Sequence, residues 1–245
     1  MISSKDNQLA KLIRSLKLKK NRDEHGLFVL EGEKFVLDAI RAGFSPKYLC
    51  VSETYAAAHQ NAADAVLLSD SVFLSIATTK TPQGILGVFE IPVREMKELL
   101  VSDRILYCNN VQNSENVGAL VRSAVCAGYG AVVLDMLTAD VYSEKAVRAS
   151  AGAILQITAV RGTSDILGYL KQKGYTIIGS SLVGSENEDI SLKKSVLVIG
   201  NEGQGMSRDI EQQCDCLVKI PIYGNCESLN AACAGTLLMY KTIGY

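Results

Sequence analysis

Apolar and polar residues repeat with two different periods along the chain, and the period changes where one expected element gives way to the next. Near the N-terminus, apolar residues recur at helical spacing and predict a helix over residues 4–16. Short apolar runs between helical segments then predict a small α/β unit. Its expected strands are residues 27–31, 48–51, 66–68 and 84–91, and its expected helices are residues 33–42, 71–77 and an alanine-rich segment near Ala56.

The remainder of the chain alternates strands and helical segments more strictly. Pro92 and the charged stretch at residues 94–98 mark the expected boundary, and we therefore predict domains at residues 1–95 and 103–245. Strict alternation is typical of an α/β fold whose parallel sheet is covered by helices on both faces. A final helix is expected at residues 228–241. The expected strands of this second domain are residues 105–108, 131–134, 154–160, 176–179, 196–200 and 216–220.

Three polar clusters each follow a strand of the second domain. Residues 109–118 open the helix that carries Arg122, residues 199–207 form a glycine-rich turn, and residues 221–230 lead into the final helix. Loops at such positions are where a parallel sheet binds nucleotide-like ligands. Taken singly, each cluster is also explained by helix caps, turn residues and a surface arginine.

The glycine-rich turn does not have the order of a dinucleotide-binding loop. Its glycines at positions 200, 203 and 205 read G-x-x-G-x-G, whereas a dinucleotide fold has G-x-G-x-x-G. Glycines in this turn suit close approach of the backbone to a ligand, but the ligand they indicate is not NAD. A nucleotide-dependent dehydrogenase is disfavoured for the same reason.

Composition narrows the class of protein. The 245 residues are 48% hydrophobic and 21% charged, an ordinary composition for a globular protein. No apolar run approaches the ~18 residues of a membrane span, and the N-terminus lacks the apolar core of a signal peptide, so we expect a cytoplasmic protein without a membrane anchor. The seven scattered cysteines and two histidines predict reduced thiols and no metal site.

Charge is unevenly distributed along the chain. The net charge is -1, yet the segment from Lys11 to Arg22 contains six basic residues and no acidic residue. Such a cluster either contacts nucleic-acid phosphates or forms a solvated helix face, and charge alone does not separate the two.

Taken together and in this order, the three clusters resemble the motifs of the SpoU (TrmH-type) RNA 2′-O-methyltransferases of the SPOUT superfamily. Residues 145–153 resemble a further segment of that family, and residues 1–95 resemble the substrate-binding domain of its ribosomal-RNA members. The resemblance therefore covers essentially the whole chain. The matching motifs are Asn116-x-Gly118-x-x-x-Arg122, Gly200-Asn201-Glu202-Gly203-x-Gly205-x-Ser207, and Ile220-Pro221 with Ser228-Leu229-Asn230.

This resemblance implies a C-terminal catalytic domain with a parallel sheet and a deep trefoil knot, and a small N-terminal α/β RNA-binding domain. It implies S-adenosylmethionine as methyl donor, no metal, and a homodimer whose sites lie near the subunit interface. Arg122 is expected to stabilise the alkoxide that forms from the ribose hydroxyl. The other expected site residues are Asn116, Glu202, Ser228 and Asn230, which would position the ribose and hold the knot loops, and Gly200, Ile220 and Leu229, which would line the cofactor pocket. Asn116 is expected beside Arg122.

Several alternatives remain open at this point. Ribosomal RNA, in particular 23S rRNA, is the expected substrate because the N-terminal resemblance is to rRNA enzymes, and transfer RNA is the alternative within the same class. An RNA-binding protein that has lost catalysis is a second alternative, although the motif residues that catalysis needs are all present.

Overall fold

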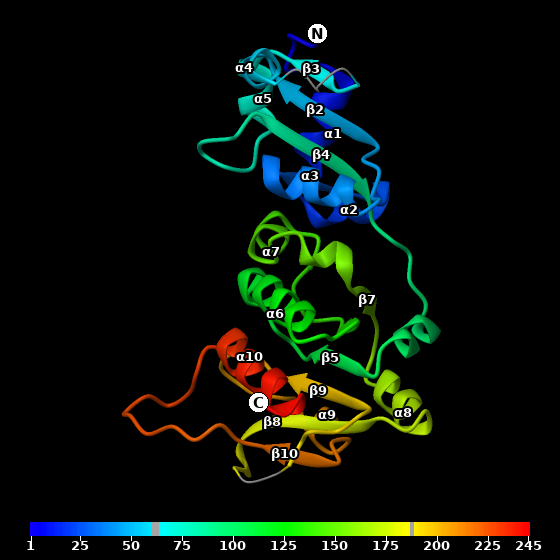
Figure 1. Ribbon diagram of the computed structural model, residues 1–245, viewed down its shortest axis with the longest axis vertical. Coiled ribbons are helices and arrows are strands. Elements are labelled where there is room, and N and C mark those ends of the chain that lie inside the picture. Colours follow the sequence, from blue (N-terminus) through cyan, green and yellow to red (C-terminus); the bar gives the residue numbers. More distant parts are fainter. Residues whose placement is uncertain (60–63, 187–188) are drawn as a thin grey trace. The chain divides into compact units, whose positions relative to one another are not determined.

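Two sheets organise the chain, each with its own set of helices (Figure 1). Clustering of contacts divides the chain into unit 1, Met1–Val93 with Tyr142–Leu155, and unit 2, Arg94–Val141 with Gln156–Tyr245. The structure is a computed structural model, and the residues that it describes are 1–59, 64–186 and 189–245.

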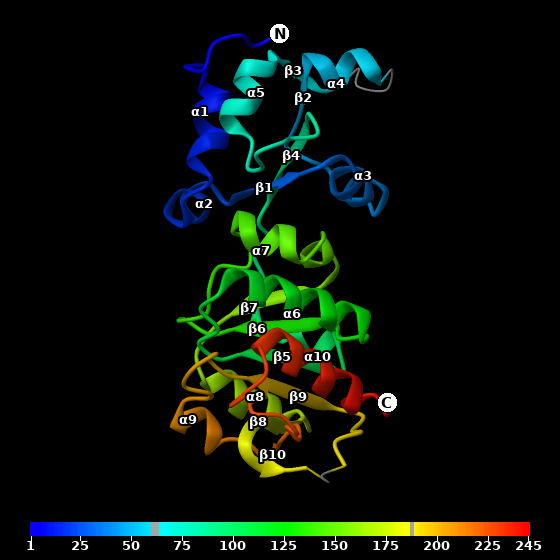
Figure 2. The same ribbon diagram turned by 90° about the vertical axis from the view of Figure 1, so that its left-hand side faces the viewer.

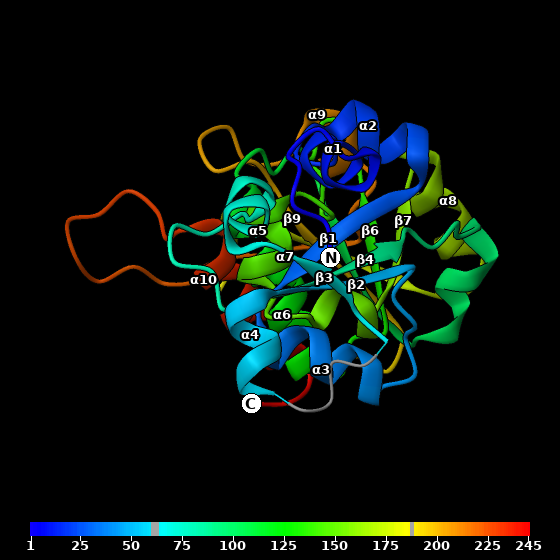
Figure 3. The same cartoon turned by 90° about the horizontal axis from the view of Figure 1, so that it is seen from above.

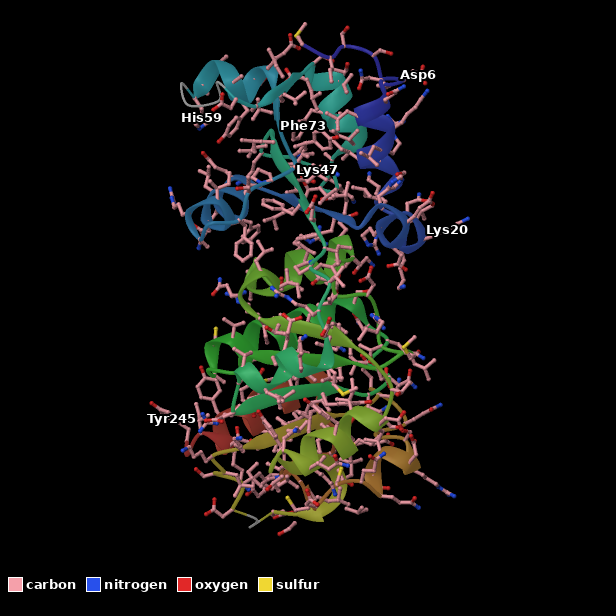
Figure 4. All side chains as sticks on the ribbon, turned by 90° about the vertical axis from the view of Figure 1, so that its right-hand side faces the viewer. Asp6, Lys20, Lys47, His59, Phe73 and Tyr245 are labelled. Atoms are coloured by element: carbon pink, nitrogen blue, oxygen red, sulfur yellow. The ribbon has the colours of Figure 1, made fainter. Side chains whose placement is uncertain are left out.

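Unit 1 contains a four-stranded sheet. Its elements are α1 (Gln8–Ser15), α2 (Lys19–His25), β1 (Leu27–Glu31), α3 (Glu33–Arg41), β2 (Tyr48–Ser52), α4 (Glu53–Ala58), β3 (Val66–Leu68), α5 (Asp70–Ile76), β4 (Ile85–Glu90) and α7 (Glu144–Ala149). The strand order is β1-β4-β2-β3, with β4 antiparallel to β1 and β2, and β2 parallel to β3. The core of the unit includes Ile13, Leu86 and Phe73, and Phe73 lies among packed side chains in Figure 4.

The segment Tyr142–Leu155 joins unit 1 although it lies far along the chain. Helix α7 contacts β1, and the rings of Phe28 and Tyr142 have their centroids 5.1 Å apart. The predicted domain bounds did not anticipate this crossing, because nothing in a local apolar pattern shows which sheet a helix will cover.

The basic cluster of unit 1 does not form one exposed face. Residues 19–25, for which we expected no element, form helix α2, and Arg22 within it is only 4% exposed. Arg22 Nη1 donates to Leu16 O at 2.7 Å and to Lys17 O at 2.9 Å, next to the C-terminal end of α1. Lys17 Nζ donates to Ala77 O at 2.9 Å. Lys20, by contrast, is exposed and extends outward in Figure 4.

Unit 2 contains the predicted parallel sheet. Its elements are η1 (Met96–Val101), β5 (Arg104–Cys108), α6 (Ser114–Cys126), β6 (Ala131–Leu134), β7 (Thr158–Arg161), α8 (Asp165–Gln172), β8 (Thr176–Ser185), β9 (Ser195–Ile199), α9 (Arg208–Glu211), β10 (Cys216–Val218) and α10 (Ala231–Thr242). The strand order is β10-β8-β9-β5-β6-β7, and every neighbouring pair in it is parallel. The α/β fold class with a parallel sheet is thus confirmed.

Helices cover both faces of this sheet, as the alternation predicted. Residues of η1, α8 and α9 share one apolar core with alternate residues of the strands. On the other face α6 and α10 lie side by side (Figure 2). Their close contact requires glycine at position 235, because a Cβ there would lie 2.3 Å from Leu120 Cδ2. Ser123 Oγ on α6 and Thr236 Oγ1 on α10 are also hydrogen-bonded, at 2.7 Å.

Four predicted elements differ from the structure in type or by three or more residues. Helix α1 begins at Gln8, after its cap Asn7, rather than at residue 4, and β8 continues to Ser185 rather than ending at residue 179. The strand expected at 154–160 is a 3₁₀ helix, η2 (Ala153–Gln156), followed by the shorter β7. Ile154 and Ile157, three residues apart, are both buried, so an apolar run that suited a strand instead covers one side of a tight turn. The final helix begins at Ala231 rather than at residue 228, because Asn230 caps it.

Candidate active site

The glycine-rich turn after β9 is folded tightly back on itself. A Cβ at Gly200 would lie 2.4 Å from backbone atoms of Gly205 and Met206, so no larger residue fits there without moving the turn. Gly205 has φ 71°, in the left-handed region that favours glycine. A Cβ at Gly203 would meet only Asn201 Oδ1, at 3.8 Å. The unusual glycine order therefore reflects two positions that the turn itself requires.

This turn is tied to the loop that follows the neighbouring strand β5. Asn201 Nδ2 donates to Asn110 O at 2.9 Å, and Ser207 N donates to Asn109 Oδ1 at 2.8 Å. Asn110 has φ 56°, a left-handed conformation that asparagine tolerates better than most residues. Because β5 and β9 are parallel neighbours, their carboxyl ends bring two of the three sequence clusters together.

Glu202, Asn116 and Asn230 form a hydrogen-bonded chain that joins all three clusters. Asn116 Nδ2 donates to Glu202 Oε1 at 2.9 Å, and Asn230 Nδ2 donates to Asn116 Oδ1 at 3.0 Å. Asn230 Oδ1 in turn accepts from the backbone of Ala232 and Cys233 at the start of α10. Three loops that are up to 114 residues apart in sequence are thereby fixed to one another.

The Glu202 carboxylate is held ionised by its donors. Burial alone would raise its pKa, but hydrogen bonds from Asn116 Nδ2 and from the backbone of Asn113 and Gln112 outweigh burial and lower it. The two backbone bonds measure 3.3 and 3.4 Å. A lowered pKa in the folded state stabilises the fold above the ordinary value of 4.5, and this contribution is lost as the pH falls through the lower, folded value. Glu202 is therefore an anchor for the loops at neutral pH and is poorly suited to accept a proton.

A cavity of about 380 Å³ lies beside these loops. This volume falls within the usual range of small-molecule sites, about 300–1,000 Å³. Its walls combine the exposed backbone of the glycine-rich turn with aliphatic side chains from four strands or loops, which suits a flat heterocycle with a polar tail such as S-adenosylmethionine. Five predicted site residues line it: Gly200, Glu202, Ile220, Ser228 and Leu229.

The third cluster forms one long wall of the cavity. The segment between β10 and α10 projects as an extended loop beside α10 (Figure 3). Ile220, Ser228 and Leu229 of this loop line the cavity, yet none of the three is buried, and Leu229 is 41% exposed. The loop is attached to the remainder of the site through Asn230.

Arg122 stands apart from the other predicted catalytic residues. It lies about two turns into α6, is exposed, and does not line the cavity. Within the described part of the chain it has no hydrogen bond or ion pair. Asn116, which we expected beside Arg122, is buried, and an offset of six positions along the helix places the two side chains on different sides of α6. A single copy of the chain therefore does not bring Arg122 to the Glu202 cluster.

The sequence predicted no role for Asp135, although its carboxylate holds the loop that follows β5. This carboxylate is 8% exposed and accepts from Asn109 Nδ2 at 2.8 Å and Asn110 N at 2.9 Å. It also accepts from the backbone and hydroxyl of Thr138. One signal could have found it: a lone acidic residue directly after the apolar strand β6, next to the strand that carries the first cluster.

The described residues contain neither a metal site nor a membrane-spanning helix. No group of three or more His, Cys, Asp or Glu side chains within the described ranges could hold a metal ion. Of the helices formed by those same residues, none has the length and apolar character needed to cross a membrane.

Comparison with known proteins identifies the class of the chain. Residues 103–240 match the SpoU rRNA methylase family, and residues 7–87 match the MRM3-like substrate binding domain. The chain therefore belongs to the SpoU rRNA methylase family. A full-length relative is the 23S rRNA (guanosine(2553)-2′-O)-methyltransferase RlmP of Bacillus subtilis, which is 32% identical over 248 residues and is matched over 99% of both chains.

Solved structures support the same class. The AdoMet-bound rRNA methyltransferase from Sinorhizobium meliloti superposes with a TM-score of 0.86 at 28% identity, covering 98% of this chain and 96% of the other. The SpoU methyltransferase AviRb from Streptomyces viridochromogenes, in complex with AdoMet, has a TM-score of 0.83 at 23% identity over 97% of this chain and 98% of its own, and shows the shared fold. The predicted enzyme class, an RNA 2′-O-methyltransferase that uses S-adenosylmethionine, is confirmed by these matches.

Proposed function

We propose that this protein methylates a ribose 2′-hydroxyl of 23S ribosomal RNA, with S-adenosylmethionine as the donor. The observation that carries the proposal is the hydrogen-bonded chain from Glu202 through Asn116 to Asn230, which fixes three loops around one cavity. The full-length similarity to a 23S rRNA 2′-O-methyltransferase supports the choice of substrate.

The cavity residues are assigned to binding and orienting the donor. Gly200 lets the turn fold closely enough for its backbone N–H and C=O groups to face the cavity, and Ile220 and Leu229 provide apolar walls. When bound, the donor supplies an electrophilic methyl group for the ribose oxygen. Ser228 lies in the same wall and is assigned to holding the ribose beside that methyl group.

Arg122 is assigned to stabilising the ribose oxygen as it loses its proton. A hydroxyl is a weak nucleophile until its negative charge can develop, and a guanidinium stabilises that charge without itself taking the proton. Glu202 is already occupied as an acceptor by three donors. We therefore assign the proton to a phosphate of the RNA, and the anchoring of the loops to Glu202, Asn116 and Asn230.

The position of Arg122 also supports a homodimer. Arg122 on α6 and Leu237 on α10, which is 54% exposed, leave charged and apolar groups uncovered on two helices that pack together. A second copy would cover these helices and bring its own Arg122 to the cavity. The same proposal includes a trefoil knot in the C-terminal domain. It also places the protein in the cytoplasm, where the RNA substrate is found.

A test of subunit sharing uses two single variants, Arg122→Ala and Glu202→Gln. Each homodimer is expected to be impaired, whereas mixed dimers recover methyl transfer because one of their two sites is intact if Arg122 acts on the partner's cavity. Sedimentation measures the assembly and methyl transfer measures the recovery. Monomers in solution, or no recovery on mixing, contradict this part of the proposal.

Transfer RNA is the alternative substrate. The match of residues 7–87 to a substrate-binding domain, together with the rRNA relative, favours ribosomal RNA. Mapping of ribose methylation in rRNA and tRNA from cells with and without the protein decides between them. We expect one 2′-O-methyl group of 23S rRNA to disappear in cells that lack the protein; loss confined to tRNA would establish the alternative, and no loss in either would indicate an inactive RNA-binding protein.

A further inference from the structure

Two large apolar side chains stand exposed on the turn that follows β6. Met136 is 63% exposed and Leu137 is 69% exposed, and both follow the buried Asp135 directly. Neither residue belongs to the cavity lining, and none of the roles assigned above uses them. Adjacent apolar residues that are exposed to this degree on a short turn gain nothing from burial within the chain.

The turn is held rigidly on both sides of the two residues. The Asp135 carboxylate accepts from Leu137 N at 3.1 Å and from Thr138 N at 2.7 Å. Arg161 Nη1 donates to Asp135 O at 2.7 Å and to Thr138 O at 3.0 Å. The structure thus fixes the backbone and points two apolar side chains outward, instead of leaving them on a loop that could fold over them.

The same turn adjoins the loop that carries the first site cluster. Asn110 N donates to Asp135 Oδ2, and Ala139 N donates to Val111 O, both at 2.9 Å. Gln112, the next residue of that loop, donates its N–H to Glu202. In the sheet, β6 and β9 lie on opposite sides of β5, so the turn flanks the β5 loop on the side away from the cavity wall.

We propose that Met136 and Leu137 contact a nucleobase next to the methylated ribose. This inference rests on the proposed function, which requires a ribose to reach the Glu202 cluster. A ribose that enters such a site leaves its neighbouring bases unstacked, and an exposed base face is an apolar surface. A methionine thioether and a leucine side chain suit that face, because methionine sulfur is polarizable and makes favourable contacts with aromatic rings.

The size of the surface argues against a protein partner at this place. A stable protein interface buries roughly 800 Å² on each partner, far more than two side chains supply. A base stacked between or upon two side chains needs only a small rigid surface. The contact is expected to favour unpaired nucleotides without choosing among the four bases, because every base has an apolar face.

The test compares Met136→Ser/Leu137→Ser with a matched control, Leu100→Ser/Val101→Ser. Leu100 and Val101 are also adjacent and exposed, but they end η1, which leads into the amino end of β5. Methyl transfer is measured with rRNA from cells that lack the protein. For Met136→Ser/Leu137→Ser we expect the KM for RNA to rise about tenfold, while kcat stays within about twofold. A rise of about tenfold corresponds to the lower part of the range of free energies measured for base stacking. The control is expected to leave both constants unchanged.

Two further measurements keep the test decisive. The exchange variant Met136→Leu/Leu137→Met retains two apolar side chains and is expected to restore the wild-type KM. Sedimentation and the melting temperature of the serine variant are expected to match those of the wild type. An unchanged KM for RNA overturns the inference, and so does dissociation into monomers, which would assign the turn to contact between copies.

The proposed function can fail separately in the same experiment. If the wild type transfers no methyl group to any RNA, the proposed function is wrong, and the inferred base contact is wrong as well. If the wild type is active and the serine variant is equally active at every RNA concentration, the base contact alone is wrong.

Discussion

Arg22 in unit 1 and Arg122 in unit 2 carry the same side chain in opposite surroundings. Arg22 is 4% exposed and donates to two backbone carbonyls. Arg122 is exposed, and the described residues provide it with no hydrogen-bond or ion-pair partner. The first guanidinium completes the hydrogen bonding at a helix end, whereas the second is available to a molecule from outside.

Burial and hydrogen-bond partners can therefore separate a structural arginine from a functional one, even in a structure without a ligand. A buried charge must be satisfied by its own chain, since an unpaired one would cost several kcal/mol, and it is then unavailable for substrate. An exposed charge without a partner contributes little to stability, so a specific role for it has to come from binding or catalysis. The two arginines can therefore be separated by experiment.

The largest expected effect belongs to Arg122→Ala. We expect kcat to fall about a thousandfold, in the range for removing a group that stabilises a developing oxyanion. Affinity for S-adenosylmethionine is expected to stay within about tenfold, because Arg122 is assigned to the ribose oxygen and the donor is assigned to other residues, which line the cavity. Single-turnover methyl transfer and calorimetric titration measure the two effects. Near-normal turnover of the variant on rRNA would contradict the catalytic role assigned to Arg122.

Arg22→Ala is expected to act on folding instead. Its loss removes two charge-assisted hydrogen bonds to backbone carbonyls, one of them buried, and the free energy of unfolding should fall by about 2–3 kcal/mol. For Arg122→Ala the corresponding change is expected to be within about 0.5 kcal/mol. Urea unfolding of both variants provides the comparison. Equal stabilities would show that burial of Arg22 contributes nothing to the fold.

Glu202→Gln is expected to lower kcat about tenfold. The glutamine amide can accept through its oxygen only, so its NH₂ group would face a backbone N–H of Gln112 or Asn113, and the loops would lose one anchor. Methyl transfer between pH 6 and 8 is the measurement. A wild type whose kcat changes with the ionisation of Glu202 in this range would contradict the lowered pKa of that residue.

The smallest effect is expected for Lys20→Ala. Lys20 is exposed and extends into solvent, so it can contribute one phosphate contact to RNA binding. We expect the KM for RNA to rise about two- to threefold and the salt dependence of binding to flatten by about one unit of slope. Lys47→Ala is the matched control, because Lys47 already faces Glu90 at 4.0 Å. A control with the same loss would remove any special role of Lys20.

Most elements could be predicted from the apolar pattern, and the errors share one cause. The parallel sheet was predicted because buried strands alternate with amphipathic helices over many turns. Short elements were missed or misjudged. Helix α2 contains no apolar residue, and the run at 154–157 fits a strand and a 3₁₀ turn equally well. An apolar pattern carries little information over so few residues, so it identifies neither element.

Seven of the eight predicted site residues, all except Arg122, lie at the cavity or in the hydrogen-bonded chain beside it, but the internal geometry of the site could not be predicted. Glycine positions, the capping asparagine and the polar loops are all visible in the sequence. The partner of each side chain is not. Asn230 was one motif residue among several until it proved both to cap α10 and to donate to Asn116. Asp135 had no motif at all, and only the neighbouring strand shows what it supports.

The class of fold, the three loops at the carboxyl edge of the sheet and the kind of chemistry that their residues allow could all be inferred from the amino-acid sequence. Those properties depend on local periodicity and on residue type, which a linear chain displays directly. The fold was needed to show that Arg22 is paired with backbone carbonyls, that Arg122 lies away from the cavity of its own chain, and that Glu202 accepts hydrogen bonds from the loop after β5. Each of these facts depends on how the helices and strands pack against one another, which a linear sequence does not display.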